Sequence, residues 1–285
     1  MADLGNAKST AEVIKKYDFS FQKRYGQNFL IDEHVLNKII DAAQIGEEDG
    51  VIEIGPGIGT MTQMLCERAK KVVAIEIDKD LIPILNETLS EYENVKVVHA
   101  DVMKTDLEAL VKAEFEGMKV KVVANLPYYI TTPIVMSLLE QHIKVSSITI
   151  MVQKEVAERM QAGPGSKDYG ALSLAVQYYA NTYIAANVPP NCFMPRPKVG
   201  SAVIRLDVYE DNQISVNDEK LMFELIRGAF NQRRKTLVNA VGNYAGLNIS
   251  KEDVANALKG MGLSENIRGE ALSLEEYAEL ANSLT

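Results

Sequence analysis

Short apolar runs alternate with stretches of helical periodicity along most of the 285-residue chain. Val51–Ile54 is an apolar run of strand length, and Thr60–Ala69 after it has the spacing of a helix. Such alternation is typical of a doubly wound, mostly parallel sheet with helices on both faces. We predict strands at Val51–Ile54, Val72–Ile77, Val95–His99, Val120–Ala124, Ser147–Val152, Tyr179–Val188 and Ser201–Val208. We predict helices at Asp32–Ala43, Thr60–Ala69, Lys79–Leu89, Leu107–Val111, Pro133–Gln141, Glu155–Met160 and Tyr169–Tyr178.

The alternating pattern ends at Tyr209–Asn217, a polar stretch without periodicity. Every later apolar stretch has helical spacing, and Ser250 and Ser273 each precede an acidic residue by three positions, as in a capping box. The last part of the chain therefore reads as a small helical domain on a short linker. Its predicted helices are Asp218–Val241, Lys251–Lys259 and Leu274–Ser283.

Composition is that of an ordinary globular protein, with 47% apolar and 24% charged residues. No apolar run reaches the length of a membrane span, and the polar start is unlike a signal peptide. Two separated cysteines, Cys66 and Cys192, fit a reducing cytoplasm. Neither they nor His34, His99 and His142 have the spacing of metal ligands, so we expect no metal.

The net charge of −9 argues against a nucleic-acid partner, but the charge is unevenly distributed. Residues 1–30 carry five basic and three acidic side chains, a net +2, and residues 221–240 carry four basic and one acidic, a net +3. Local basic patches can bind phosphates in an acidic protein. A solvated helix face explains so small a patch equally well.

Gly55, Gly57 and Gly59 form a glycine-rich turn between a predicted strand and a predicted helix. Glycines let the backbone approach a ligand closely. A dinucleotide-binding turn would have glycine or alanine at position 60, where this chain has Thr60, so the spacing disfavours NAD. A glycine-rich turn alone is a weak signal, because such turns are common.

Polar side chains follow at the ends of the next strands. Glu76 lies 21 positions after Gly55, where a carboxylate can accept hydrogen bonds from both hydroxyls of a ribose. Asp101 follows the third strand and suits an adenine amino group, and Asn125 follows the fourth. Singly, each is more simply a turn former or a helix cap. Together they predict a ligand site at the carboxyl edge of the sheet.

The clearest indication of a chemical reaction is a tetrapeptide after the fourth strand: Asn125, Leu126, Pro127 and Tyr128. An aromatic exocyclic amine is a poor nucleophile, and two acceptors, the Asn125 oxygen and the Leu126 carbonyl, can hold its hydrogens as positive charge develops. Pro127 would fix the turn, and a swung-out base could stack on Tyr128. Alone, the tetrapeptide is a buried strand ending in a proline turn. With the glycine turn and the two acids, it favours S-adenosylmethionine as cofactor.

These motifs, in this order, resemble the ribosomal RNA adenine N6-dimethyltransferases that act on small-subunit rRNA. The resemblance covers essentially the whole chain, and the joint match is far more specific than any single motif. It is carried by Lys23–Leu30, Glu53–Gly59, Glu76–Asp78, Asp101, Asn125–Ile130, Val152–Ala157 and Phe193–Ser201.

The resemblance implies a Rossmann-like, class I S-adenosylmethionine-dependent methyltransferase fold with a small all-α C-terminal domain. The N-terminal segment 1–30 would close over the cofactor, residues 31–209 would form the catalytic domain, and residues 210–285 would contact the RNA or ribosome. The implied cofactor residues are Gln27, Asn28, Leu30, Gly55, Gly57, Gly59, Glu76, Ile77, Asp101, Val102 and Asn125.

The resemblance also implies that Tyr128 and Phe193 sandwich the target adenine while Asn125 and the Leu126 carbonyl hold its amine. An aromatic residue before a proline-rich turn more often fills a core, so Phe193 has this second interpretation. The expected RNA-binding residues are Lys23, Arg24, Arg227, Arg233, Arg234 and Lys235.

The expected reaction is dimethylation of two adjacent adenosines near the 3′ end of small-subunit rRNA, within an assembling 30S particle, by a cytoplasmic monomer. The nearest alternative is the related large-subunit rRNA methyltransferase that confers macrolide resistance. An assembly factor that acts mainly by binding is a second, and a DNA or small-molecule N-methyltransferase is a third.

Overall fold

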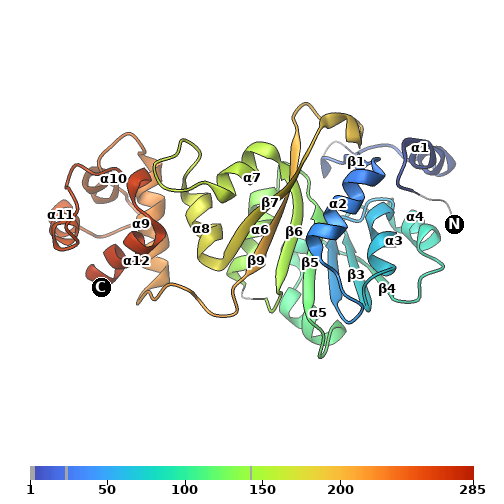
Figure 1. The fold of residues 1–285 in the computed structure, drawn as a ribbon, viewed down its shortest axis with the longest axis horizontal. Helices are drawn as coiled ribbons and strands as arrows, with labels where there is room; N and C mark the ends of the chain where they lie inside the picture. The colour runs from blue at the N-terminus through green and yellow to red at the C-terminus, as the bar shows by residue number, and fades with distance from the viewer. Residues whose placement is uncertain (1–3, 23–24, 142) are drawn as a thin grey trace. The chain divides into compact units, whose positions relative to one another are not determined.

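A computed structural model describes residues 4–22, 25–141 and 143–285 (Figure 1). The chain packs into two compact units, the first formed by Met1–Ala157 and Thr182–Val208, the second by Glu158–Asn181 and Tyr209–Thr285. The chain passes from the first unit to the second for the last time between Val208 and Tyr209, where the domain boundary was expected. The segment Glu158–Asn181, which we had assigned to the sheet domain, packs instead with the C-terminal helices.

A seven-stranded sheet forms the centre of the first unit, in the order β4-β3-β2-β5-β6-β9-β7. The strands from β4 to β6 are parallel, and β9 is antiparallel to β6. The predicted mostly parallel sheet is therefore confirmed. The strands are β2 (Gly50–Ile54), β3 (Lys71–Glu76), β4 (Val95–His99), β5 (Val120–Asn125), β6 (Ser147–Gln153), β7 (Ala180–Val188) and β9 (Ser201–Val208).

The strand order reverses at β2, because the chain continues to β3 on one side and β5 lies on the other. In open α/β sheets, ligands bind outside the carboxyl ends of the strands at such a reversal. Every residue of β2 is buried, as are the first five of β5, which accounts for their largely apolar sequences, interrupted only by Glu53 and Lys121. The strands β2 and β5 therefore form the buried centre of the sheet, and their carboxyl ends lie at the point where the strand order reverses.

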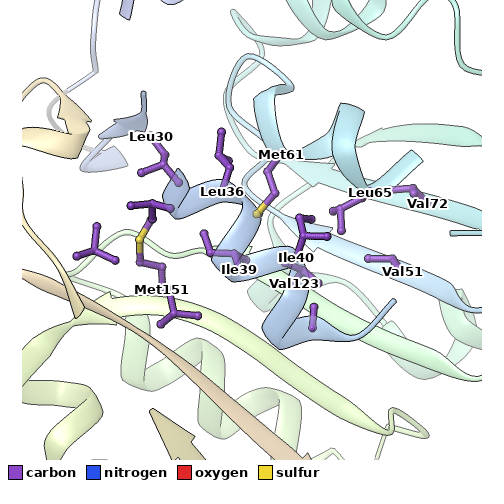
Figure 2. Packing of buried hydrophobic residues seen from close by; sticks show 14 of the residues in the cluster. Leu30, Leu36, Ile39, Ile40, Val51, Met61, Leu65, Val72, Val123 and Met151 are labelled. Carbon is purple, nitrogen blue, oxygen red and sulfur yellow. The ribbon is translucent and has the colours of Figure 1, made fainter. Parts of the chain in front are cut away.

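Helices cover the sheet of the first unit at or near the predicted positions. Figure 2 shows Leu36, Ile39 and Ile40 of one helix beside Met61 and Leu65 of the next, all within one buried apolar cluster. Full burial of one such side chain stabilises a fold by about 1.5–3 kcal/mol. The helices are α2 (Glu33–Ala43), α3 (Thr60–Cys66), α4 (Ile82–Thr88), α5 (Leu107–Glu114) and α6 (Thr131–Glu140), with short 3₁₀ turns η2 (Val102–Lys104) and η3 (Pro190–Cys192). The helix α7 (Lys154–Gln161) begins in the first unit, and its residues from Glu158 onward belong to the second.

A helix near the N-terminus, α1 (Ala7–Lys16), was not predicted. Asn6 caps it by accepting hydrogen bonds from the backbone N–H groups of Lys8 and Ser9. Only Thr10 of the helix is buried, so its apolar periodicity was too weak to detect. The same part of the chain forms β1 (Phe29–Leu30), which pairs antiparallel with β8 (Phe193–Met194).

The second unit is helical, as expected for the C-terminal residues. Its elements are α8 (Ala171–Tyr179), α9 (Glu219–Asn231), α10 (Leu237–Gly242), α11 (Lys251–Gly260), η4 (Gly269–Ala271) and α12 (Leu274–Ser283). Tyr178 and Tyr179 of α8 pack against Phe223 of α9, which explains why this segment joins the C-terminal helices. The capping boxes that begin at Ser250 and Ser273 are confirmed.

The prediction of one continuous helix over Asp218–Val241 is wrong. The helix α9 ends at Asn231, and α10 begins at Leu237 after a polar turn. Thr236 caps α10 by accepting from the Asn239 backbone N–H, and the Leu237 N–H donates to the Ile267 carbonyl, outside any helix. No helix in the described part of the chain is long and apolar enough to cross a membrane.

Candidate active site

A pocket of the first unit opens at the carboxyl ends of β2, β3 and β5, beside the turn after β4. Its lining is mostly apolar with a few polar groups at the strand ends, as is typical of small-molecule sites. Ten of the eleven expected cofactor residues line it: Gln27, Asn28, Leu30, Gly55, Gly57, Glu76, Ile77, Asp101, Val102 and Asn125. Leu126, Pro127 and Tyr128 also line it, whereas Gly59 and Phe193 do not.

The glycines of the turn after β2 have different surroundings. Gly55 has a φ of +70°, and a Cβ atom added there would meet nothing within 4 Å, so its backbone faces open space in the pocket. Gly59 caps α3 with a φ of +94°, and a Cβ atom there would lie 2.9 Å from Thr88 Oγ1. Gly55 therefore leaves room for a ligand, while Gly59 lets the turn pack against α4.

Glu76, at the end of β3, is 4% exposed and is one of the residues that line the pocket. Its Oε1 accepts from the Asp78 backbone N–H at 2.8 Å, and its Oε2 accepts from the Gly57 N–H at 3.3 Å. Burial raises the pKa of the Glu76 carboxyl to about 7, against the lowering effect of these two donors. The carboxylate is thus held beside the glycine turn, where it can accept from a polar ligand.

The segment before β1 is tied to the sheet through Gln27. Its Nε2 donates to Asp78 Oδ2 at 2.7 Å, and its Oε1 accepts from the Gln22 backbone N–H at 2.8 Å. Asp78 is 1% exposed and its N–H is bound by Glu76. Gln27 therefore borders the pocket while it fastens the N-terminal segment beside Glu76. Asp78 was not among the predicted site residues, although it lies within the Glu76–Asp78 motif.

Asp101 follows β4 and serves two purposes at once. Its Oδ1 accepts from the Met103 backbone N–H at 3.0 Å, so it caps η2, which is the simpler interpretation of an acid at this position. Its Oδ2 lies 3.8 Å from Lys104 Nζ at the surface. Asp101 also lines the pocket together with Ile77 and Val102. An apolar space with one carboxylate at its edge suits a purine ring that carries an amino group.

Asn125 ends β5 with its amide held in a defined orientation. Its Nδ2 donates to the backbone carbonyl of Asn28 at 3.0 Å. Because the nitrogen of the amide is engaged in this way, the Oδ1 atom is directed elsewhere and remains an acceptor for another donor. The contact joins β5 to the N-terminal segment across 97 positions of sequence.

The turn after Asn125 is rigid. The Leu126 backbone N–H donates to the Met151 carbonyl at 3.2 Å, which continues the pairing of β5 with β6. The Pro127 carbonyl accepts from the Ile130 N–H at 3.2 Å and from Thr131 Oγ1 at 3.0 Å, at the start of α6. These bonds hold Leu126 and Pro127 at the pocket wall.

Tyr128 is half-buried, and its hydroxyl lies 2.6 Å from Ser201 Oγ on β9. Burial raises the pKa of this phenol, so it stays neutral at ordinary pH. Phe193 is 3% exposed, pairs with Leu30 in the β1–β8 ribbon and belongs to the same buried cluster as α2. The structure does not bring Phe193 into the pocket lining, and its stacking role stays a prediction.

Glu53 lies in the middle of β2 and lines the pocket, although it was not among the predicted site residues. It is 0% exposed, and neither carboxylate oxygen has a hydrogen-bond partner within the described residues. Burial raises the pKa of Glu53 to about 8, against the lowering effect of the neighbouring Thr62 hydroxyl, and the nearby charge of Glu76 adds to the rise. Glu53 is therefore largely neutral at pH 7. A lone acid within an otherwise apolar strand was the available signal.

Two tyrosines at the pocket were also missed. Tyr25 and Tyr129 line it, and Tyr129 is 60% exposed. Its ring packs over Gly26, where an added Cβ atom would lie 3.2 Å from the ring. Tyr129 follows directly on the Asn125–Tyr128 motif, so its position in the sequence was the only hint of its place at the pocket.

The expected RNA-binding residues of the second unit differ in their surroundings. Arg227 pairs with Glu224 at 2.6 Å, and Arg233 pairs with Glu270 at 2.7 Å. The next two cations in sequence, Arg234 and Lys235, are exposed and form no ion pair with any described residue. The expected pair Lys23 and Arg24 lies outside the described residues.

Comparison with known proteins adds the following findings. The family model described as "Ribosomal RNA adenine dimethylase" matches residues 18–285. The chain is 61% identical over 283 residues to "Ribosomal RNA small subunit methyltransferase A" of Lachnoclostridium phytofermentans, covering 99% of this chain and 98% of that protein. It is 54% identical over 284 residues to the protein of the same name from Alkaliphilus oremlandii, covering 100% of this chain and 99% of that protein.

Two solved structures are similar in fold. A dimethyladenosine transferase from Plasmodium falciparum matches with a TM-score of 0.75 and 29% identity, over 88% of this chain and 95% of that one. The 23S rRNA methyltransferase ErmE matches with a TM-score of 0.69 and 22% identity, over 90% of this chain and 99% of that one. At this identity the second likeness shows the fold alone.

Proposed function

Because the chain belongs to the ribosomal RNA adenine dimethylase family, we propose that it dimethylates N6 of two adjacent adenosines near the 3′ end of small-subunit rRNA, with S-adenosylmethionine as methyl donor. One observation in this chain supports the proposal most directly. Glu76 and Asp101, the acids suited to a ribose and an adenine, line the same pocket as the Asn125–Tyr128 motif. A nucleoside cofactor and a target amine can therefore meet there.

The residues present fit the cofactor. Gly55 leaves open space at the backbone of the turn, Glu76 offers a carboxylate for the ribose hydroxyls, and Asp101 lies beside the apolar side chains that would enclose the adenine. S-adenosylmethionine supplies a methyl group that is already activated on a sulfonium, so the protein needs no covalent nucleophile. Its own task is to align the acceptor amine and exclude water.

Asn125 and Leu126 act on the target amine. In the first transfer the Asn125 Oδ1 and the Leu126 carbonyl oxygen accept the two hydrogens of the amine, and in the second transfer one of them accepts the hydrogen that remains. These bonds localise the lone pair and stabilise the positive charge that develops on nitrogen, which is lost when the methylated amine releases a proton to solvent. Asn28 contributes through its backbone carbonyl, because the bond from Asn125 Nδ2 turns Oδ1 away from it. Tyr128, fixed through Ser201, offers the face on which the swung-out base stacks.

The substrate is an assembling small subunit, bound by a monomer in the cytoplasm. Among the expected RNA-binding residues of the second unit, Arg234 and Lys235 are best suited to phosphates, because both are exposed and neither is paired with a described acid. Arg227 and Arg233 are engaged by Glu224 and Glu270, so their direct contribution is smaller. Phosphate contacts fix position on an RNA but carry no sequence information, so shape selects the site.

The test is a labelling experiment. The protein is incubated with labelled S-adenosylmethionine and unmethylated small subunits, large subunits or free rRNA, and modified bases are mapped by mass spectrometry. Paired dimethyladenosines in the small subunit alone are the expected result. Label in large-subunit RNA would instead indicate the function of the resistance-conferring methyltransferases. Absence of label from every substrate would favour an assembly factor that acts by binding.

A further inference from the structure

Tyr129 is the most exposed large hydrophobic side chain in the described part of the chain, at 60%. The other exposed side chains of this kind are Ile77, Met103, Tyr183 and Val199. Of these five residues, Tyr129 and Ile77 line the pocket. A single exposed ring on a protein surface needs no explanation. An exposed ring at the mouth of a pocket, however, offers an apolar face to a ligand that enters there.

Tyr129 is held in place through its backbone and its ring. The residue lies within the turn that the Ile130 N–H closes on the Pro127 carbonyl, shortly before α6 begins. Its ring packs against Gly26, because a Cβ atom added to that glycine would lie 3.2 Å from Tyr129 Cδ1 and 3.5 Å from Pro127 Cβ. The ring of Tyr129 is therefore supported on one side and open to solvent elsewhere.

The two consecutive tyrosines of this turn have different surroundings. Tyr128 is half-buried, and its hydroxyl lies 2.6 Å from Ser201 Oγ. Tyr129 is exposed, yet partial burial, with the nearby Tyr25 and the charge of Asp101, raises the pKa of its phenol. Tyr129 is thus a neutral ring at ordinary pH. One ring of the pair belongs to the pocket wall and the other to its mouth.

The proposed substrate brings a second base to the same mouth. Its two target adenosines are adjacent, so when one adenine enters the pocket the other is attached one nucleotide away. An aromatic side chain can stack on any base, and a purine offers a larger ring than a pyrimidine. A neutral, exposed tyrosine next in sequence to the ring that stacks on the target can therefore receive this neighbouring base.

We propose that Tyr129 forms a second base subsite at the pocket mouth, where its ring stacks on the adenine next to the target adenosine. This inference rests on the proposed function, since it gives the second adenosine of the pair a place. An RNA strand crosses the mouth in one direction, so the subsite lies on one side of the target. The second adenine therefore occupies it during methylation of one adenosine of the pair and not of the other.

The first experiment measures steady-state kinetics of the full-length protein on unmethylated small subunits. We expect Tyr129→Ala to raise the KM for small subunits by about 5- to 150-fold, the range that loss of one base–aromatic stack produces. The kcat should change little, because the stack is the same before and during methyl transfer. Tyr129→Phe keeps the ring and should match wild type.

The matched control is Tyr183→Ala, which removes a tyrosine of similar exposure, 57%, on β7 and outside the pocket lining. It should leave the KM for small subunits unchanged. Calorimetry with S-adenosylmethionine should give the wild-type affinity for Tyr129→Ala, which also shows that the variant is folded.

The second experiment changes the neighbouring base itself. Small subunits are prepared with uridine in place of one adenosine of the pair, in both versions, and methylation of the remaining adenosine is measured. In the version that places uridine at the subsite, Tyr129→Ala should cost less than it does on the unaltered subunit, because the wild type has already lost part of the stack. In the other version the cost should stay as large.

The outcomes separate this inference from the function on which it rests. If wild type methylates small subunits and Tyr129→Ala keeps the wild-type KM, there is no second base subsite at Tyr129. A loss of cofactor affinity in Tyr129→Ala would assign the ring to the cofactor instead, and equal costs in both uridine versions would show that it does not contact the neighbouring base. If wild type methylates no small subunit, the proposed function fails and the subsite with it.

Discussion

The orientation of a single amide decides whether the Asn125 motif can act on an amine. Asn125 Nδ2 is bound to the Asn28 carbonyl, so the oxygen is the acceptor left for the target. We expect Asn125→Ala to lower the rate of methyl transfer about 10²–10³-fold, the usual effect of removing one charge-stabilising group. Asn125→Asp should also fail, because a carboxylate has no hydrogen to donate to Asn28. Single-turnover kinetics on small subunits measures both rates.

A matched control for Asn125 is Asn37→Ala, which removes an amide on α2 that is bound only to a backbone carbonyl of its own helix. This variant should keep the wild-type rate. Subunit binding should survive in all three variants. Full activity of Asn125→Asp would contradict the role given to the Asn28 bond, since the donor would then be dispensable.

Glu53 links stability to pH. Its folded pKa of about 8 lies above its ordinary value of 4.5, so the folded state favours the protonated acid. The favourable contribution is complete below pH 4.5 and is lost as the pH rises towards 8, by about 1.4 kcal/mol per pH unit. We expect Glu53→Gln, which cannot ionise, to gain stability relative to wild type between pH 5 and 8.

Urea unfolding at pH 5.5, 7 and 8.5 tests this expectation. Glu76, whose pKa is raised to about 7, contributes a dependence of the same sign, so the Glu53→Gln variant should be less sensitive to pH without becoming insensitive. Parallel pH profiles for the wild type and the variant would show that Glu53 is ionised in the folded protein.

At the scale of elements, the glycine turn after β2 separates ligand binding from folding. Gly55→Ala places a methyl group in the pocket, whereas Gly59→Ala forces one against Thr88 of α4. Both positions have positive φ, which costs an alanine about 1–2 kcal/mol. We expect Gly55→Ala to weaken cofactor binding beyond this strain, and Gly59→Ala to lower the melting temperature more than Gly55→Ala does.

Gly117→Ala is the control for backbone strain, because Gly117 also has positive φ, meets nothing within 4 Å and lies outside the pocket lining. Its melting temperature should fall as that of Gly55→Ala does, with cofactor affinity unchanged. Calorimetry of cofactor binding and thermal melts of the three variants provide the comparison. Equal cofactor affinities for Gly55→Ala and Gly117→Ala would remove Gly55 from the ligand site.

The central strands β2, β3, β5 and β6 were predictable because a strand buried on both faces is almost wholly apolar in sequence. Helices were less predictable where a capping residue is the main sequence feature that marks where the helix begins. The polar turn after α9 contains neither glycine nor proline, so helical periodicity seemed to continue to Val241, and Thr236 was the only local sign of a new start. The capping residue Asn6 similarly marks α1, a helix whose side chains are almost all accessible.

The site was predictable to the extent that it lies at strand ends. Parallel strands bring Glu76, Asp101 and Asn125 to one edge of the sheet whatever their distance in sequence. Contacts that depend on how the N-terminal segment folds back were not predictable, because no periodicity encodes them. The bonds from Asn125 to Asn28 and from Gln27 to Asp78 are of this kind.

At the scale of the whole molecule, an acidic protein that binds RNA must do so locally. The net charge is −9, yet the adjacent residues Arg234 and Lys235 are both exposed and neither forms an ion pair with a described acid. General attraction to polyanions should therefore be weak at physiological salt, while a substrate of the right shape can still use these few contacts. The net negative field repels every RNA alike, so selectivity must come from contacts that only a substrate of the right shape can make.

Competition with a homopolymer RNA tests this balance. In about 0.15 M salt, excess poly(U) should leave methylation of small subunits unchanged, because non-specific affinities are then typically only about 10⁻⁴–10⁻⁶ M. In about 0.05 M salt, poly(U) should inhibit, and Arg234→Ala combined with Lys235→Ala should relieve the inhibition. Strong inhibition in both salts would mean that the protein attracts RNA generally. Inhibition that persists in the double variant would show that residues other than Arg234 and Lys235 make the phosphate contacts.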